Sequence, residues 1–171
     1  MSSTGPIEFS YYIAENLYAG EYPGDWDEEI TKMKIADFHR FGITDFIDLT
    51  KDPHLLPYEP YILDGMVRHS FPIQDRSTPE DFQLPGEIFK KVESLRSSGR
   101  KVYIHCWGGI GRTGLVVACW LGQFYHLNGK DALDRLKDLW RTCPKSKYAA
   151  CSPENELQRQ YVVKYLQSDF V

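Results

Sequence analysis

A cysteine and an arginine six positions apart, joined by a glycine-rich stretch, are the residues of this sequence best suited to chemistry. They stand in the run His105-Cys106-Trp107-Gly108-Gly109-Ile110-Gly111-Arg112-Thr113-Gly114. Its glycines let the backbone bend so that several amide hydrogens can converge on one point. A helix predicted to begin near Arg112 adds unpaired amide donors and about half a positive charge. The run is therefore expected to bind an anion through the backbone of residues 107–111.

Cys106 lies at the entrance of this anion site, and Arg112 presents a planar fork that suits two oxygens of a phosphate. Amide dipoles and a guanidinium favour a thiolate, and cysteines in comparable surroundings have pKa values of about 3.5 to 7.5. We expect Cys106 to be ionised at neutral pH and to attack a phosphorus atom held by its own loop. Thr113 would offer its hydroxyl to the sulfur, which steadies the sulfur as a leaving group in a second step.

The other cysteines show that this pattern is specific to Cys106. Each of them lacks an arginine six positions later: Cys119, Cys143 and Cys151. Cys119 is expected in the core, with a redox partnership with Cys106 as the minor alternative. A plain glycine-rich connection with a buried thiol is the competing interpretation of the run. An adenine-nucleotide phosphate loop is excluded, because the Lys-Ser/Thr ending of that motif is absent.

The pair His105-Cys106, the five-residue gap and Arg112-Thr113-Gly114 resemble the signature of the cysteine-dependent protein tyrosine phosphatases. The length and the single-domain layout resemble the compact dual-specificity branch of that superfamily. The resemblance is strongest in the loop and extends over about residues 43–141. It implies hydrolysis of a phosphate ester in two steps through a phosphocysteine intermediate, with no metal and no cofactor.

Cleavage of a phosphate ester needs a proton donor for the departing oxygen, and a carboxylic acid is the usual one. Sites in open parallel sheets lie beyond the carboxyl ends of the strands. Asp75 directly follows the strand predicted at 67–73, and 31 residues separate it from Cys106. That separation accommodates one helix and one strand, and it is similar to the position of the acid in the phosphatase family. Asp75 is therefore the predicted general acid and base.

Other acidic residues compete with Asp75 for this role. Glu80 and Asp81 stand where helix capping explains them. Asp48 and Asp52 follow the strand predicted at 43–49 and could line the same rim and hold Arg112.

Four further residues near these positions have weaker assignments. His105 is expected to point away from the substrate and to tune Cys106 by a hydrogen bond within the loop. Trp107 is expected to pack on the sheet rather than to form a wall of the pocket. Arg76 could equally contact the substrate or be solvated. Gln158 is expected on a helix surface, although some tyrosine phosphatases keep a water-orienting glutamine in this stretch.

The elements that must position these residues alternate between strand and helix. Strands are predicted at 9–13, 16–19, 43–49, 67–73 and 101–105. One helix is expected to open with a capping box at Asp25 and to stop at Gly42, and the next to begin at Thr78. A third begins at the glycine-rich loop, a fourth follows Asn128-Gly129, and the last opens at Ser152. This alternation predicts an α/β fold, a central and mostly parallel sheet with helices on both faces.

Length and composition predict one compact domain. The chain has 171 residues, which fits a single domain over residues 9–171 after a loose segment over 1–8. The net charge of −4 argues against binding nucleic acid or an anionic membrane through bulk charge. No apolar run approaches the ~18 residues of a membrane helix, and the start lacks a signal-peptide pattern. Four cysteines without an export signal then predict reduced thiols in a cytoplasmic protein, expected as a monomer.

The sequence thus predicts a phosphatase whose partner is a phosphorylated protein or peptide. The target would be phosphotyrosine, with or without phosphoserine and phosphothreonine. One alternative is a phosphoinositide or inositol-phosphate phosphatase, but the loop has none of the lysines that polyanionic substrates call for. Another is a catalytically silent phosphate-binding module, against which the intact set of Cys106, Arg112 and Asp75 argues. Metal binding is not expected, because the cysteines and histidines lack metal-ligand spacing.

Overall fold

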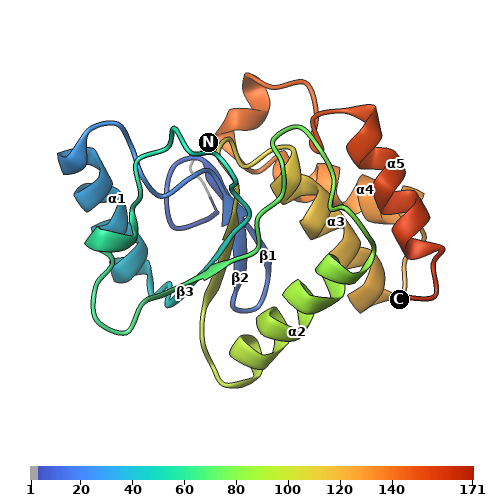
Figure 1. The fold of residues 1–171 in the computed structure, drawn as a ribbon, viewed down its shortest axis with the longest axis horizontal. Coiled ribbons are helices and arrows are strands. Elements are labelled where there is room, and N and C mark those ends of the chain that lie inside the picture. The colour runs from blue at the N-terminus through green and yellow to red at the C-terminus, as the bar shows by residue number, and fades with distance from the viewer. Residues whose placement is uncertain (1–3) are drawn as a thin grey trace.

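The computed structural model describes residues 4–171, and a five-stranded sheet lies at its centre (Figure 1). The strands in chain order are β1 (Ser10–Ala14), β2 (Leu17–Gly20), β3 (Asp45–Asp48), β4 (Val67–Ser70) and β5 (Val102–His105). Their order across the sheet is β1-β2-β5-β3-β4. Only β1 runs antiparallel to its neighbour among these described strands. The predicted α/β fold with a mostly parallel sheet is confirmed, and β5 occupies the middle of it.

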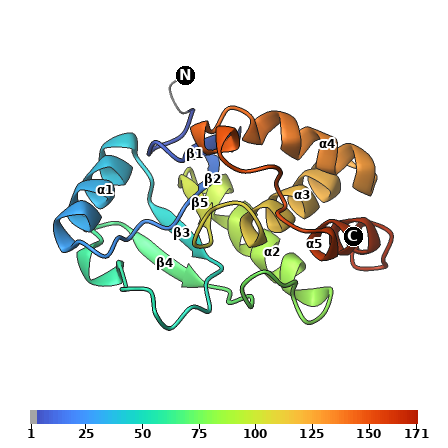
Figure 2. The ribbon, with the colours of Figure 1, turned by 90° about the horizontal axis from the view of Figure 1, so that it is seen from above.

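Helices cover both faces of the sheet, as predicted (Figure 2). The helices are α1 (Glu28–Phe41), α2 (Gln83–Ser97), α3 (Arg112–Tyr125), α4 (Gly129–Trp140) and α5 (Glu156–Leu166). Helix α1 lies alone on one face, and the other four gather on the opposite face. Two short 3-10 helices, Glu59–Tyr61 and Pro144–Lys147, interrupt the connections.

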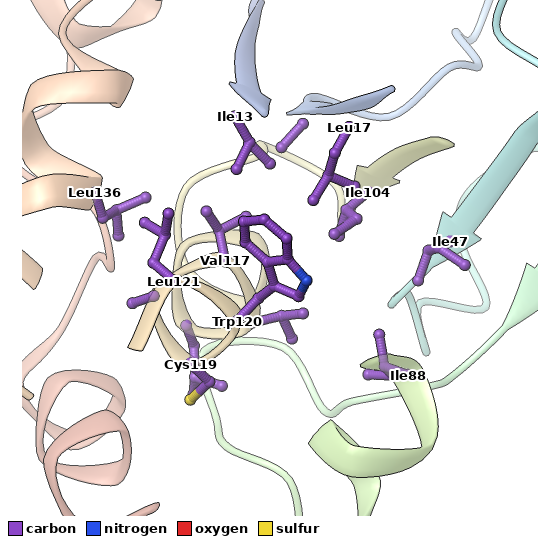
Figure 3. Packing of buried hydrophobic residues seen from close by; sticks show 14 of the residues in the cluster. Ile13, Leu17, Ile47, Ile88, Ile104, Val117, Cys119, Trp120, Leu121 and Leu136 are labelled. Atoms are coloured by element: carbon purple, nitrogen blue, oxygen red, sulfur yellow. The ribbon is translucent and has the colours of Figure 1, made fainter. Parts of the chain in front are cut away.

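The side chains of the central strands alternate between two cores. Phe46 and Tyr103 join the core beneath α1, whereas Ile47 and Ile104 join the larger core beneath α2 to α5. This alternation follows from the period of two along a strand. Figure 3 shows Val117 of α3, with its neighbours, packed against the strand residues of the larger core. Helix α3 is buried from its first turn onward, so the loop that precedes it is held firmly at its C-terminal end.

Three helix starts differ from the sequence prediction. The cap of α1 is Asp27, whose carboxylate accepts from Glu29 N, and not Asp25. Helix α2 begins at Gln83 rather than at Thr78. Helix α5 begins after Asn155, whose side chain accepts from a backbone N–H in the first turn, rather than at Ser152.

At α1 and α5 the cap is another polar residue near the predicted one. The N-cap position of α2 is Phe82, which makes no side-chain cap bond. The delayed start of α2 leaves residues 74–82 as an irregular connection after β4, and this connection carries the predicted acid, Asp75.

Part of the predicted loose segment over 1–8 lies outside the described residues, namely 1–3. From residue 4 the chain packs on the domain. Thr4 Oγ1 lies 3.1 Å from Thr142 Oγ1, and Ile7 is buried in the core beneath α1. Over residues 4–171, none of the helices combines the length and the apolar character that crossing a membrane requires.

Candidate active site

The glycine-rich loop connects the end of β5 at His105 to the start of α3 at Arg112, at the carboxyl edge of the sheet. Its tightest point is Gly109, which has a φ of 76°. A Cβ atom at Gly109 would lie 2.3 Å from the carbonyl carbon of Gly20 at the end of β2. Only glycine avoids both the left-handed strain and this backbone clash. The loop can therefore curl against β2.

Cys106 is the first residue after β5, and its sulfur belongs to this curl. The backbone N–H of Gly109 donates to Cys106 Sγ at 3.3 Å, and the residue is 3% exposed. An amide aimed at the sulfur stabilises negative charge on it. The structure thus brings together the loop backbone and the predicted nucleophile.

Arg112 is buried at 2% exposure and extends toward two carboxylates. Its Nη1 donates to Ile73 O at 3.0 Å, and its Nη2 donates to Asp52 Oδ2 at 2.9 Å. Asp75 Oδ1 lies 3.2 Å from Nη2. Burial acts to lower the pKa of Arg112, but the Cys106 sulfur and the two carboxylates outweigh burial and raise it. The guanidinium is therefore a fixed cation between the nucleophile and the predicted acid.

The two acids that were expected at this rim have different roles. Asp52 contacts Arg112, whereas Asp48 pairs with Arg68 at 2.7 Å and accepts from the backbone N–H of Thr50. Asp75 is more open, with 42% of its side chain exposed. It is the carboxylate near Arg112 that a substrate could reach.

The segment 75–77, which we call the acid segment, is held by the first turn of α5 and its cap. Asn155 Nδ2 donates to the carbonyl of Arg76 at 2.9 Å, and Gln158 Nε2 donates to the carbonyl of Ser77 at 3.1 Å. Arg76 itself is exposed and has a φ of 57°, a conformation that non-glycine residues adopt only when neighbouring contacts hold them. Two amide side chains thus fix the backbone next to Asp75.

The expectation that Gln158 lies on a helix surface is wrong. Gln158 is completely buried, and its carbonyl Oε1 has no hydrogen-bond partner among residues 4–171. The preceding residue, Leu157, is 57% exposed, and the buried face of α5 runs through Gln158, Tyr161 and Tyr165. The available signal was the resemblance to tyrosine phosphatases, some of which keep a glutamine in this stretch.

His105 bonds within the loop, in the place that was expected. Burial lowers the pKa of His105, so the ring is neutral. Its Nδ1 lies 3.0 Å from the Cys106 carbonyl, which can only accept, so Nδ1 carries the proton. Tyr58 then donates its hydroxyl to Nε2 at 2.8 Å. Burial and the nearby Asp48 raise the pKa of Tyr58, which keeps that hydroxyl protonated.

Two loop residues differ from the sequence prediction. Thr113 is buried, but its Oγ1 makes no hydrogen bond within the described chain, so the predicted bond to Cys106 is not formed. Trp107 is 53% exposed and lies edge-on to His54, so the expected packing on the sheet is wrong. The rings of Tyr22, Tyr58 and His105, which contact one another, are buried in its place.

Two side chains that sequence reasoning missed brace the outside of the loop. Lys145 Nζ donates to Gly108 O at 2.8 Å and to Glu21 Oε2 at 3.1 Å. Ser152 Oγ donates to Ile110 O at 2.7 Å. Both carbonyls are engaged by these braces. Nothing in the sequence predicts that Lys145 and Ser152 contact the loop, because both lie far from it along the chain.

Metal ligands and the thiol of Cys119 are the other features of the described chain that bear on its chemistry. Within residues 4–171, no group of three or more histidine, cysteine or acidic side chains could hold a metal ion. Cys119 is fully buried in α3, and burial raises the pKa of its thiol well above the usual range. It is a core residue, as expected.

Comparison with known proteins identifies the family. A family model described as "Polymorphic toxin system, DSP-PTPase phosphatase" matches residues 26–123. The putative tyrosine phosphatase 067L of Invertebrate iridescent virus 3 is 29% identical over 167 residues, which cover 91% of this chain and 64% of the viral protein. Human cyclin-dependent kinase inhibitor 3 is 34% identical over 113 residues, covering 66% of this chain and 52% of that protein.

A solved structure shares the fold over nearly the whole chain. The crystal structure of Tk-PTP in the active form superposes with a TM-score of 0.71 at 23% identity, covering 92% of this chain and 95% of that one. The present chain spans between about half and two thirds of the length of the curated relatives it matches. The family model covers more than half of the sequence, including the loop and the acid segment. The chain therefore belongs to the dual-specificity-like cysteine protein tyrosine phosphatases.

Proposed function

We propose that this protein is a phosphatase that hydrolyses phosphotyrosine in proteins, with or without phosphoserine and phosphothreonine. The observation that carries the proposal is the convergence of three groups. The Cys106 sulfur receives a loop amide, the Arg112 guanidinium belongs to the same loop, and Asp75 lies 3.2 Å from that guanidinium. A nucleophile, an oxyanion-binding cation and an acid at one site are what transfer of a phosphoryl group requires.

In the first step Cys106 Sγ attacks the phosphorus and the bond to the ester oxygen breaks. Asp75 gives its proton to the departing oxygen, so the alcohol or phenol leaves neutral. The loop amides and Arg112 hold the three non-bridging oxygens, where charge stabilisation counts most. A bound phosphate competes with Asp75 for the guanidinium, which frees Asp75 for the leaving group. Asp52 keeps its 2.9 Å contact and holds the guanidinium in place.

In the second step Asp75, now a carboxylate, takes a proton from a water molecule. The water oxygen attacks the phosphorus and the sulfur–phosphorus bond breaks. Inorganic phosphate leaves and Cys106 is again a thiolate, so atoms and charges balance over the cycle. Asp75 is suited to both steps because it is open to water, whereas Asp52 is almost fully buried.

Charge supports a protein substrate over an inositol phosphate. Residues 107–111 contain no lysine or arginine, and the chain carries a net charge of −4. A polyanionic headgroup needs several cations near the cradle. One phosphoryl group needs only Arg112 and the loop amides. The ratio of rates on a phosphotyrosine peptide and on an inositol lipid tests this choice, and faster lipid turnover would contradict it.

The mechanism is tested with two variants and a series of aryl phosphates. Cys106→Ser is expected to keep binding phosphate esters and to lose turnover. Asp75→Ala is expected to lower kcat by about 10²- to 10⁴-fold for poor leaving groups, and far less for very acidic ones, because the lost proton matters only when the leaving group needs it. Asp81→Ala, an exposed carboxylate that accepts from the backbone of α2, is the matched control.

Two results would contradict the mechanism. A serine variant with normal turnover would remove Cys106 from the chemistry. An equal loss in Asp75→Ala for good and poor leaving groups would place the acid elsewhere.

A further inference from the structure

A pocket of about 110 Å³ opens directly beside the phosphate-binding loop, on the side of the connection between β2 and α1. The residues around it that matter here are Trp26, Trp107, Asp25, Glu21 and Lys34. Trp107 immediately follows Cys106 in the chain, so the pocket begins one residue from the predicted nucleophile. We call it the tryptophan pocket. Nothing in the two chemical steps uses it.

Its walls are aromatic and largely open to solvent. Trp26 is 62% exposed and Trp107 is 53% exposed. The His54 ring neighbours both, with its centroid 6.3 Å from that of Trp26 and 6.4 Å from that of Trp107. Exposed tryptophans that flank a pocket are typical anchor points for a binding partner.

Among the charged side chains that line the tryptophan pocket, the one without an ion-pair partner in the described chain is negative. Lys34 is fully engaged, because its Nζ donates to Glu21 Oε1 at 3.1 Å and to the carbonyls of Tyr22 and Gly24. Glu21 is also paired with Lys145. The Asp25 carboxylate accepts only a backbone N–H, that of Asp27, and over residues 4–171 it has no ion-pair partner. One unpaired carboxylate therefore lines the same pocket as two indole rings.

We propose that the tryptophan pocket binds an arginine or lysine side chain of the phosphorylated polypeptide, close in sequence to the phosphorylated residue. This inference rests on the proposed function and adds a substrate preference to it. A guanidinium or ammonium group is attracted to an indole face and more strongly so when an acid stands beside it. A peptide advances at most about 3.6 Å per residue, so a residue within about two positions of the phosphorylated one reaches a pocket that adjoins the loop.

The test measures binding, so that it does not depend on turnover. Calorimetry with the Cys106→Ser variant gives Kd for phosphotyrosine peptides that carry Arg, Lys, Leu or Glu at each of two positions on either side of the phosphotyrosine. At one of these positions, Arg and Lys are expected to bind about three- to tenfold more tightly than Leu. The preference for Arg and Lys over Leu should shrink when the salt concentration is raised from 0.05 to 0.5 M, because the Debye length then falls about threefold.

Two substitutions assign that preference to the pocket. In the same background, Asp25→Asn and Trp26→Leu should each bring the Arg-to-Leu ratio of Kd values close to one. Asp138→Asn is the matched control, because Asp138 is an exposed carboxylate on α4, on the opposite face of the sheet from α1. It should leave the ratio as it is.

Each contrary result has a distinct meaning. A preference for Leu over Arg would make the pocket an apolar one and overturn the inference. Equal Kd values for all peptides would also overturn it, and hydrolysis of the same peptides by the wild-type chain would show that the proposed function survives. If no peptide binds, the inference fails, and wild-type turnover of an aryl phosphate decides the proposed function separately.

Discussion

Replacement of Gln158 by leucine should separate activity from stability. Gln158 is completely buried at the start of α5, where its Nε2 donates to Ser77 O and its Oε1 has no partner in residues 4–171. Leucine has a similar size and fits the apolar face that continues through Tyr161 and Val162. The substitution removes the contact with the acid segment and also removes the unpaired carbonyl.

The change in unfolding free energy follows from these opposing terms. Loss of the hydrogen bond and of a partner for Ser77 O costs about 1–3 kcal/mol. Relief of the unpaired, buried Oε1 returns about the same amount, because an orphaned polar atom carries a penalty of about 1–3 kcal/mol. The net change is therefore expected within about 1 kcal/mol of zero. Activity has no such compensation, because a misplacement of about 1 Å at a catalytic group can cost about 100-fold.

The assays are thermal or urea unfolding and kcat for aryl phosphates with poor and good leaving groups. We expect the unfolding free energy of Gln158→Leu to match wild type, and kcat for the poor leaving group to fall by about tenfold or more. Gln160→Leu is the matched control, because Gln160 is an exposed glutamine two residues after Gln158 on the same helix. A loss of more than about 2 kcal/mol with unchanged leaving-group dependence would refute the reasoning and make Gln158 a purely structural residue.

Two further predictions concern the loop and the residue before it. Gly109→Ala should lower the free energy of unfolding by more than the ~1–2 kcal/mol of left-handed strain, because its Cβ would also clash with the Gly20 backbone. The same substitution should weaken phosphate binding, measured by calorimetry. Gly86→Ala, where a Cβ meets nothing within 4 Å, should instead be neutral or stabilising. Burial lowers the pKa of His105, so below about pH 6.5 its imidazole binds a proton in the unfolded chain but not in the folded one. The free energy of unfolding should therefore fall as the pH drops from 7.5 to 5.5. His105→Gln should flatten the urea-unfolding free energy over that range, and an unchanged slope would contradict this assignment.

Local sequence signals were enough to predict the scaffold and the position of the glycine-rich loop within it. Apolar strands of four or five residues, separated by amphipathic stretches, have few arrangements other than an α/β sheet. The glycine run between β5 and α3 predicts the loop, because only glycine suits the backbone there. Gly109 has a left-handed φ, and its Cα lies too close to the Gly20 backbone for a side chain. Asp75 was predicted because it follows a strand and because its separation from Cys106 is similar to that of the acid in the phosphatase family. That strand is β4, at the edge of the sheet.

Features that depend on contacts between distant segments could not be predicted. Whether Gln158 or Leu157 faces the core depends on the rotation of α5 against α3, which shifts the buried stripe by one residue. Trp107 is exposed, whereas Tyr22 and Tyr58, from two distant segments, are buried against each other. Helix α2 begins at Gln83, although Thr78 and Pro79 are residue types typical of a helix start.

The connection that leads into α5 shows why the loop sequence alone does not make the site. Ser152 engages a carbonyl of the phosphate loop, and three and six residues later Asn155 and Gln158 hold the acid segment. The loop has glycines where this connection approaches, and a Cβ at Gly111 would lie 2.6 Å from Glu154 Oε1. One short segment therefore sets the position of the nucleophile loop relative to the acid. Because both steps of the proposed reaction require that relative position, substitutions in residues 152–158 should affect kcat more than the binding of phosphate.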